Sequence, residues 1–157
     1  MERIDNYRAA KPDDYDALTK LLPQLADFEI PVRRVANDLW EGDAELLKTV
    51  LEEKIQVTFA DVAVDADDQI QGIILVTLRD EMLCHEPSAH LEAIVVSPKA
   101  RGQGLGRRLL VRTEERVKAL GAESLTLHVF SNNTRARSLY RSQGFEEEML
   151  RSIKWLD

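Results

Sequence analysis

Three glycines at alternating positions, Gly102, Gly104 and Gly106, lie in the stretch ARGQGLGRRLL between two apolar segments. The segment before them, HLEAIVV, has the branched residues of a buried strand. The residues after them, 104–120, have the apolar spacing of a helix that ends at Gly121. The loop therefore lies at a helix N-terminus, where backbone N–H groups lack partners and the helix dipole is positive. Such a bare backbone can close on a phosphate, so the stretch predicts a phosphate-bearing ligand.

The spacing of the glycines separates the known kinds of phosphate-binding loop. A dinucleotide-binding loop has the pattern G-x-G-x-x-G, but the residue three positions after Gly104 is Arg107. A P-loop ends in Gly-Lys-Ser/Thr, which this chain lacks. A protein that binds ATP or NAD through these glycines is therefore a disfavoured alternative. A second alternative is that the glycines only form a tight turn between strand and helix and bind no ligand.

The rest of the chain alternates strand and helix patterns that predict a mixed α/β fold in one domain, residues 1–157. The predicted elements, in chain order, are a strand at 4–11, a helix from 12, a helix at 43–54, a hairpin of strands 57–65 and 70–78, a polar loop at 80–89, a strand at 90–96, a helix at 104–120, a strand at 124–130, a helix at 132–142 and a last strand at 145–156.

Composition favours a cytoplasmic protein. No apolar run approaches the roughly 20 residues of a membrane span. The N-terminal stretch MERIDNYRAAKPDD is too acidic and too polar for a signal peptide. The single cysteine, Cys84, cannot form an internal disulfide, which favours a reducing compartment. We therefore expect neither a membrane nor an oxidising environment.

Charge is distributed unevenly along the chain, whose net charge is −7. Residues 1–90 hold 20 acidic and 9 basic side chains, whereas residues 91–157 hold 8 acidic and 12 basic ones. One interpretation is simply two solvated surfaces of different composition. The other is that the second half binds an anion and the first half a cation. The acidic total argues against nucleic acid as the partner.

Two segments of the second half resemble one enzyme family. VSPKARGQGLGRRLL is similar to the pyrophosphate-binding segment of the GNAT superfamily of acetyl-CoA-dependent N-acetyltransferases, whose core is Arg/Gln-x-x-Gly-x-Gly/Ala. NNTRARSLYRSQGF is similar to the family's segment Asn-x-x-Ala-x-x-x-Tyr-x-x-x-Gly-Phe. The residues that fill the two patterns are Arg101, Gly104, Gly106, Asn133, Ala136, Tyr140, Gly144 and Phe145. Two matching segments at a suitable separation make the resemblance specific.

The resemblance implies a GNAT fold with a mostly antiparallel central sheet and acetyl-CoA as co-substrate. The strand at 91–96 would splay from the strand at 124–130, with a β-bulge, so that pantetheine bonds to exposed main chain and a bulge N–H stabilises the thioester oxygen. The predicted acetyl-CoA site consists of Ile94, Val95, Val96, Arg101, Gly102, Gln103, Gly104, Leu105, Gly106, Arg107, Asn133, Ala136 and Tyr140.

The resemblance also implies an acid and a base. Tyr140 would protonate the departing sulfur, unless it is a packed core tyrosine. Glu92 would take a proton from the amine, directly or through water, unless it is an exposed or salt-bridged glutamate. Strict alternation along the strand predicts Glu92, Ile94 and Val96 on one face of the sheet.

The acidic first half suits a cationic amine acceptor, and small amines, polyamines, aminoglycosides, amino acids and peptide amines all remain open. The residues expected to line the acceptor site are Phe28, Trp40, Asp80, Glu81 and Glu86. A non-catalytic acyl-CoA-binding sensor with the same fold is the alternative function.

Two further expectations concern metals and assembly. Cys84, His85 and His90 lack the spacing of metal ligands, so we expect no metal site. The segment after Gly144 provides one strand where the family often has two. A sheet that is one strand short leaves an edge open, which favours a homodimer.

Overall fold

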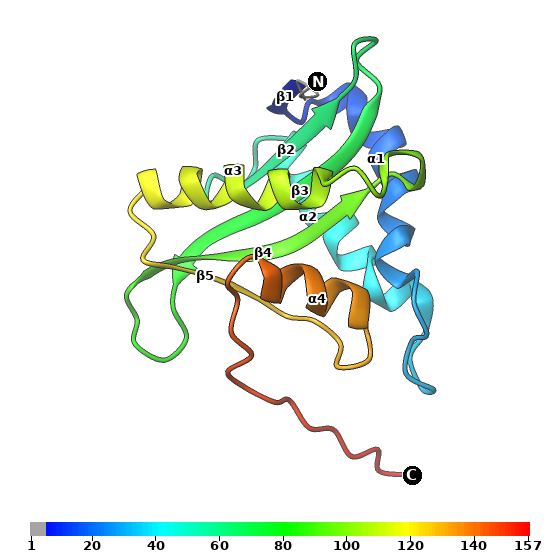
Figure 1. Ribbon diagram of the computed structural model, residues 1–157, viewed down its shortest axis with the longest axis vertical. Coiled ribbons are helices and arrows are strands. Elements are labelled where there is room, and N and C mark those ends of the chain that lie inside the picture. The colour runs from blue at the N-terminus through cyan, green and yellow to red at the C-terminus, as the bar shows by residue number, and fades with distance from the viewer. Residues whose placement is uncertain (1–5) are drawn as a thin grey trace.

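A five-stranded sheet with the order β1-β2-β3-β4-β5 organises the computed structural model of the chain, which describes residues 6–157 (Figure 1). The strands are β1 (Asn6–Ala9), β2 (Thr58–Val64), β3 (Ile70–Asp80), β4 (Pro87–Val96) and β5 (Ser124–Leu127). The pairs from β1 to β4 are antiparallel, and β5 runs parallel to β4. The predicted mixed, mostly antiparallel sheet is confirmed.

Helices cover both faces of this sheet, with α3 in front and α1 and α2 behind (Figure 1). The α-helices are α1 (Tyr15–Leu21), α2 (Glu41–Leu51), α3 (Leu105–Ala119) and α4 (Thr134–Ser142). The 3₁₀ turns are η1 (Pro12–Asp14), η2 (Leu22–Ala26), η3 (Ala36–Leu39) and η4 (Pro98–Ala100). Across residues 6–157, none of the helices combines the length and apolar character that crossing a membrane needs.

Two apolar cores hold the layers together. Behind the sheet, Leu18 of α1 and Leu47 of α2 are fully buried against the odd-numbered residues of β3, such as Ile73. In front, Leu105 and Leu109 of α3 pack on the even-numbered residues of the same strand. Because successive residues of a strand point to opposite faces, one sheet provides the floor of both cores.

The splay and the bulge that the resemblance implies are both confirmed. β5 pairs with β4 only from Ser88 to Leu91, so the edge of β4 that faces β5 has no strand partner from Glu92 onward. The pairing of β4 with β3 shifts register at the same place, because Leu91 and Ala93 oppose consecutive residues of β3 and Glu92 is the extra residue. The sheet therefore has a gap that begins at the bulge.

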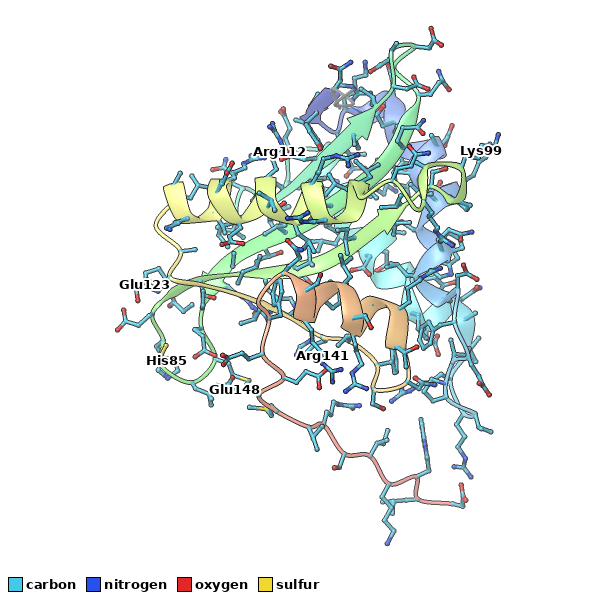
Figure 2. The ribbon with its side chains drawn as sticks, in the orientation of Figure 1. His85, Lys99, Arg112, Glu123, Arg141 and Glu148 are labelled. Atoms are coloured by element: carbon cyan, nitrogen blue, oxygen red, sulfur yellow. The ribbon has the colours of Figure 1, made fainter. Side chains whose placement is uncertain are left out.

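The prediction of a last strand at residues 145–156 is wrong. These residues form neither a helix nor a strand, and the segment runs away from the sheet past α4 (Figure 1). Glu147 is held by two arginines of α4, Arg137 at 2.7 Å and Arg141 at 2.8 Å. Figure 2 shows Arg141 near this start of the segment and Glu148 beside it. These ion pairs direct the chain along α4 instead of along the edge of β5.

Other boundaries differ by a few residues. The predicted polar loop at 80–89 is shorter, because Asp80 already pairs with Pro87 and the hairpin of β3 and β4 continues to that point. The strand predicted at 124–130 ends at Leu127, where the sheet opens. The second helix begins and ends two to three residues earlier than the range 43–54.

Candidate functional site

The backbone of the loop between β4 and α3 favours glycine at two positions. Gly102 and Gly104 have φ angles of 76° and 74°, in the left-handed region that other residues avoid. Gly106 lies close to its neighbours, and a Cβ there would be in van der Waals contact with Cδ2 of Leu139 at 3.4 Å and Cγ2 of Val96 at 3.7 Å. The loop thus presents a bare backbone at the start of α3, and α3 comes close to both β4 and α4.

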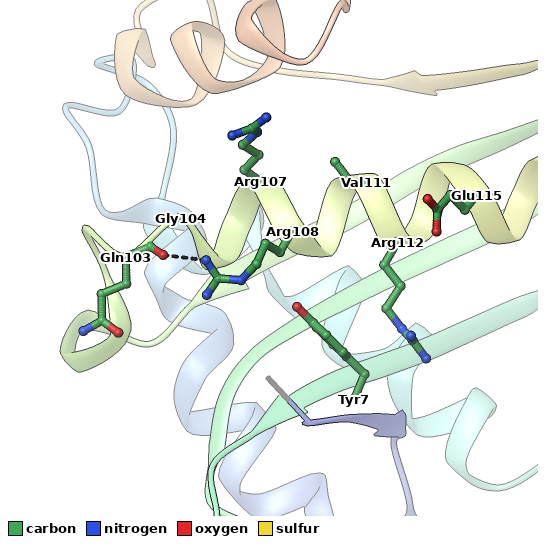
Figure 3. A pocket seen from close by; sticks show the side chains of 8 residues that line it. All are labelled: Tyr7, Gln103, Gly104, Arg107, Arg108, Val111, Arg112 and Glu115. Atoms are coloured by element: carbon green, nitrogen blue, oxygen red, sulfur yellow. Dashed lines mark hydrogen bonds between the residues drawn. The ribbon is translucent and has the colours of Figure 1, made fainter. Parts of the chain in front are cut away.

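The arginines around this loop have separate roles. The guanidinium of Arg101 donates to Asp27 and to Gln24, each at 2.9 Å, so Arg101 ties the loop to the end of η2. Arg108 donates to the carbonyl of Gln103 at 2.6 Å. Arg107 is exposed and extends on the side of α3 that faces α4 (Figure 3). Of the predicted phosphate-binding arginines, Arg107 is therefore the one whose guanidinium is turned outward beside the loop.

A shallow hollow extends along α3 from the same loop, and Arg107 belongs to its lining (Figure 3). Its walls include Tyr7 of β1 and Arg112 of α3, whose guanidinium lies 4.7 Å from the centre of the tyrosine ring. Gln103 and Gly104 complete the rim at the loop. Cationic side chains consequently flank the start of α3 on both sides.

The gap in the sheet opens in front toward Tyr140 of α4. Ile94 and Val96 of β4 pack in the front core together with Tyr140 and Leu139. The tyrosine ring stacks edge-on against Phe145, with ring centres 5.7 Å apart. Burial raises the pKa of Tyr140 to about 12, so the hydroxyl keeps its proton throughout the physiological range. It is also a weaker acid than a free phenol.

Asn133 begins α4 as its N-cap. Its side-chain oxygen accepts a hydrogen bond from the backbone N–H of Ala136 at 3.3 Å. An N-cap of this kind satisfies one of the unpaired donors of the first turn. The cap explains the Asn and Ala positions of the second motif structurally, since it fixes the start of the helix that carries Tyr140.

Behind the sheet, the bulge turns Glu92 away from the position that simple alternation predicts. Ile94 and Val96 pack in the front core, whereas the charge of Glu92 acts on Asp43 of α2, behind the sheet. The prediction that Glu92 shares a face with Ile94 and Val96 is therefore wrong, because one extra residue reverses the alternation. Burial, and then the charge of Glu92, raise the pKa of Asp43 to about 7.

His90 is another titratable residue behind the sheet. It is 5% exposed, its Nδ1 lies 2.8 Å from Oγ1 of Thr126, and its ring is 4.9 Å from that of His128. Burial, and next the charge of Arg79, lower the pKa of His90 to about 4, against the opposing effect of Glu92. At neutral pH the imidazole is thus uncharged, and it belongs to a polar part of the sheet. The other hydroxyls of this part pair across strands: Thr58 with Thr77, and Ser88 with Ser124.

The residues predicted to line the acceptor site are not brought together. The ring of Phe28 packs on Phe130, with centres 5.6 Å apart, and Trp40 packs against the rear core. Asp80, Glu81 and Glu86 belong to the hairpin turn, where the carboxylate of Glu81 accepts hydrogen bonds from two backbone N–H groups. That turn, marked by His85 in Figure 2, lies at the opposite side of the molecule from the segment that follows η2. Within residues 6–157, no group of three or more His, Cys, Asp or Glu side chains could hold a metal ion.

Asp43 is the residue of this site that sequence reasoning missed. In the sequence it is one of several acids at the start of a predicted helix, a position that the helix dipole favours for any acid. Nothing in its neighbourhood along the chain indicates a partner 49 positions away, at the bulge of β4. Only the packing of α2 behind β4 reveals the pair.

Comparison with known proteins identifies the family. The model of the acetyltransferase (GNAT) family matches residues 25–145, so the chain belongs to this family and is an acetyltransferase. Members of this family use acetyl-CoA. It is similar over 143 residues, at 31% identity, to the uncharacterized N-acetyltransferase YhfO of Bacillus subtilis, and the match covers 91% of each chain.

Other similar proteins share a part of the sequence or the fold. Mycothiol acetyltransferase of Renibacterium salmoninarum is 32% identical over 108 residues, which are 67% of this chain but only 32% of that longer protein. A putative acetyl transferase from Pyrococcus furiosus superposes with a TM-score of 0.74 at 22% identity, covering 96% of this chain and all of the other. AAC(6')-Iy in complex with the bisubstrate analogue CoA-S-monomethyl-acetylneamine superposes with a TM-score of 0.70 at 20% identity, covering 99% of each chain.

Proposed function

We propose that the chain forms one N-acetyltransferase domain, which moves the acetyl group of acetyl-CoA directly to a primary amine while both substrates are bound. The observation that carries this proposal is the free edge of β4, whose pairing with β5 ends at Leu91. Tyr140, a protonated phenol, packs in front of this part of β4, and the carboxyls of Glu92 and Asp43 belong to the rear side. An acid on one face and a base on the other suit direct transfer between two substrates.

Acetyl-CoA would bind in front, from the glycine loop to the gap. The bare backbone of Gly102 and Gly104 at the start of α3 fits a pyrophosphate, with Arg107 as an additional cation. The open edge of β4, residues 94–96, offers main-chain groups to the pantetheine amides and to the thioester oxygen.

In the proposed reaction the amine approaches from behind the sheet. An ammonium group first gives a proton to a carboxylate, for which Glu92 is the candidate, and the neutral nitrogen then attacks the thioester carbon. The C–N bond forms and the C–S bond breaks, and the sulfur takes the proton of the Tyr140 hydroxyl as it leaves. The nitrogen loses its second proton to solvent as the amide forms, and the phenol regains a proton from solvent. With the proton that the carboxylate releases, the products are the amide, free CoA and one proton.

A cationic acceptor fits the rear side of the gap best. Two carboxyls lie there, and the surrounding strand surface carries hydroxyls and an uncharged imidazole, with Arg79 toward the hairpin end of the strands. Several similar proteins are named N-acetyltransferases, which is consistent with an amine as the acceptor. Within this class we infer a small amine with a positive charge.

A screen of primary amines tests the proposed function. Release of free CoA thiol from acetyl-CoA would be followed with diamines, spermidine, aminoglycosides and amino acids. We expect turnover with at least one amine, and initial-velocity lines that intersect when both substrates are varied, as a ternary complex requires. Parallel lines would contradict direct transfer. Tight CoA binding without turnover of any amine would favour the alternative, a non-catalytic acyl-CoA sensor.

We further propose that the protein is a homodimer. β5 is an edge strand, and the segment after Phe145 carries several large apolar side chains with wide exposure. They are Met149, Leu150, Ile153, Trp155 and Leu156. An open strand edge and an exposed apolar segment are each surfaces that a second copy can cover. Light scattering at high micromolar concentration should give twice the chain mass, and a monomer there would refute the proposal.

A further inference from the structure

Three consecutive residues after η2 connect the two loops at the end of the sheet where β4 and β5 diverge. Because β4 and β5 are parallel, the loop that leads to α3 and the loop that leads to α4 both begin at this end. Asp27 accepts a hydrogen bond from Arg101 of the first loop, and the ring of Phe28 packs on Phe130 of the second. We call residues 27–29 the strap, since they hold both loops.

The strap is also attached to the start of α4. The carbonyl of Glu29 accepts a hydrogen bond from the side-chain amide of Asn132 at 2.5 Å. Arg135, in the first turn of α4, lies 3.9 Å from the carboxylate of Asp27. The carboxylate of Asp27 therefore lies between two guanidinium groups, that of Arg101 beside the glycine loop and that of Arg135.

The guanidinium of Arg101 is occupied by groups of this chain. Each of its nitrogens donates to one partner: Nη1 to Asp27 at 2.9 Å, Nη2 to Gln24 at 2.9 Å and Nε to the carbonyl of Val96 at 3.4 Å. The glycine motif predicts this arginine to bind acetyl-CoA, whose pyrophosphate is an anion. A carboxylate of the chain thus bonds to a cation that the ligand would need.

The contact between Asp27 and Arg101 is suited to exchange. The hydrogen bond from Arg101 lowers the pKa of Asp27, so the carboxylate is charged throughout the physiological range. The side chain of Asp27 is 53% exposed and that of Arg101 is 28% exposed, so a ligand can reach the pair. An exposed ion pair contributes little stability, whereas a pyrophosphate offers more charge and several acceptor oxygens in one group.

We propose that Asp27 competes with the pyrophosphate of acetyl-CoA for Arg101 and Arg135, so that binding of acetyl-CoA releases the strap. This inference rests on the proposed function, since it requires the pyrophosphate to lie at the glycine loop. In the free protein Asp27 is the internal anion that keeps the strap closed. In the complex the two arginines bond to the ligand instead. Release also frees the ring of Phe28, one of the residues expected to line the acceptor site, so the second substrate meets a different surface once the first is bound.

The first experiment tests the competition by the sign of its effect. CoA binding would be measured by titration calorimetry on the parent, Asp27→Asn and Gln24→Glu. We expect Asp27→Asn to bind CoA about threefold more tightly, because the competing charge is removed. Gln24→Glu should bind CoA about threefold more weakly, because a second carboxylate then faces Nη2 of Arg101. Both factors correspond to the energy of one exposed ion pair.

Two further variants control for other effects of charge. Glu123→Gln also removes one negative charge, at an exposed position just before β5 and at the opposite end of that strand from Phe130 (Figure 2). It should leave CoA affinity within about 1.5-fold of the parent, since distant exposed charges are screened. Asp27→Glu keeps the carboxylate and should bind CoA as the parent does. Unchanged or weaker binding in Asp27→Asn, or equal tightening in Glu123→Gln, would overturn the competition.

The second experiment measures the release of the strap itself. Hydrogen exchange of residues 27–35 would be followed by mass spectrometry with and without CoA. In the parent we expect CoA to speed exchange in this segment while it slows exchange in the glycine loop. In Asp27→Asn the segment should exchange fast even without CoA. Slower or unchanged exchange of residues 27–35 when CoA binds to the parent would overturn the release.

The outcomes separate this inference from the proposed function. CoA binding by the parent without tightening in Asp27→Asn refutes the competition and leaves the CoA site in place. Absence of CoA binding by the parent refutes both. Tighter binding in Asp27→Asn, weaker binding in Gln24→Glu and faster exchange of the strap together support the inference.

Discussion

The front and the rear of the sheet differ in how their functional residues are distributed along the chain. In front, the glycine loop and α4 supply the proposed CoA-binding groups from one continuous half, residues 91–146. Behind, the charge of Glu92 at the bulge of β4 acts on Asp43 of α2, across 49 positions of sequence. Phosphate binding depends on local backbone shape at a helix N-terminus, which a short motif encodes. A raised carboxyl pKa depends on burial and on a neighbour in space, which only the assembled fold provides.

The sharpest test of the front face is Gly104→Val. At a φ of 74° a β-branched residue is strained, and its Cβ would lie 3.2 Å from Nη1 of Arg108, beside the proposed pyrophosphate position. We expect CoA affinity to fall by more than about 100-fold in titration calorimetry, equivalent to roughly 3 kcal/mol.

The matched control for this variant is Gly121→Val. Gly121, which follows α3, also has a positive φ, 94°, and a Cβ at this position would meet no atom within 4 Å. It reproduces the backbone strain at the other end of the helix and should leave CoA affinity unchanged. Equal losses in the two variants would show that strain, and not the ligand, explains the result, and unchanged affinity in folded Gly104→Val would remove the loop from the CoA site.

Tyr140→Phe should have the next largest effect, again on the front face. The substitution retains the ring and its contact with Phe145 but removes the proton that the sulfur would take. We expect kcat to fall by about 10²-fold with little change in CoA affinity or melting temperature. Tyr15→Phe, in the rear core, serves as the control and should leave turnover intact. Turnover of Tyr140→Phe within about twofold of the parent would mean that the tyrosine is structural.

The sequence was sufficient for features that depend on short-range pattern. The helix after the glycines follows from the spacing of Leu105, Leu109 and Val117, all of which are buried. The hairpin of β2 and β3 follows from two runs of branched residues around an aspartate-rich turn. The resemblance to the GNAT family predicted the gap between β4 and β5. The alternation of residues alone would have predicted a strand that is paired along its whole length.

Features that depend on competition between distant groups could not be predicted. The segment 145–156 has the composition of a strand, but the ion pairs of Glu147 with Arg137 and Arg141 turn its start along α4. The resemblance implied a bulge in the strand at 91–96, but not that Glu92 is the extra residue and that the alternation reverses there. The expected acceptor-lining residues were chosen by charge and aromaticity, and they lie at opposite sides of the molecule because neither property determines position.

The smallest expected effect tests the rear face through stability. The raised pKa of Asp43 means that the folded protein holds a proton between about pH 4 and pH 7 where the unfolded chain has lost it. The folded state thus binds more protons in that window, and stability must decrease as pH rises through it. Above pH 7 the folded protein carries the full cost of the charged carboxyl. Asp43→Asn has no charge to bury, so it should be more stable than the parent at pH 8 and nearly equal to it at pH 4.5.

For a partly exposed group, solvent screening reduces this gain to about 1–2 kcal/mol, a rise in melting temperature of a few degrees. Thermal unfolding of the parent, of Asp43→Asn and of the control Glu45→Gln, on an exposed position of the same helix, measures it at both pH values. The gain should appear in Asp43→Asn alone and only at the higher pH. A gain of equal size at both pH values would come from helix propensity or packing, and would mean that Asp43 does not titrate in this pH range.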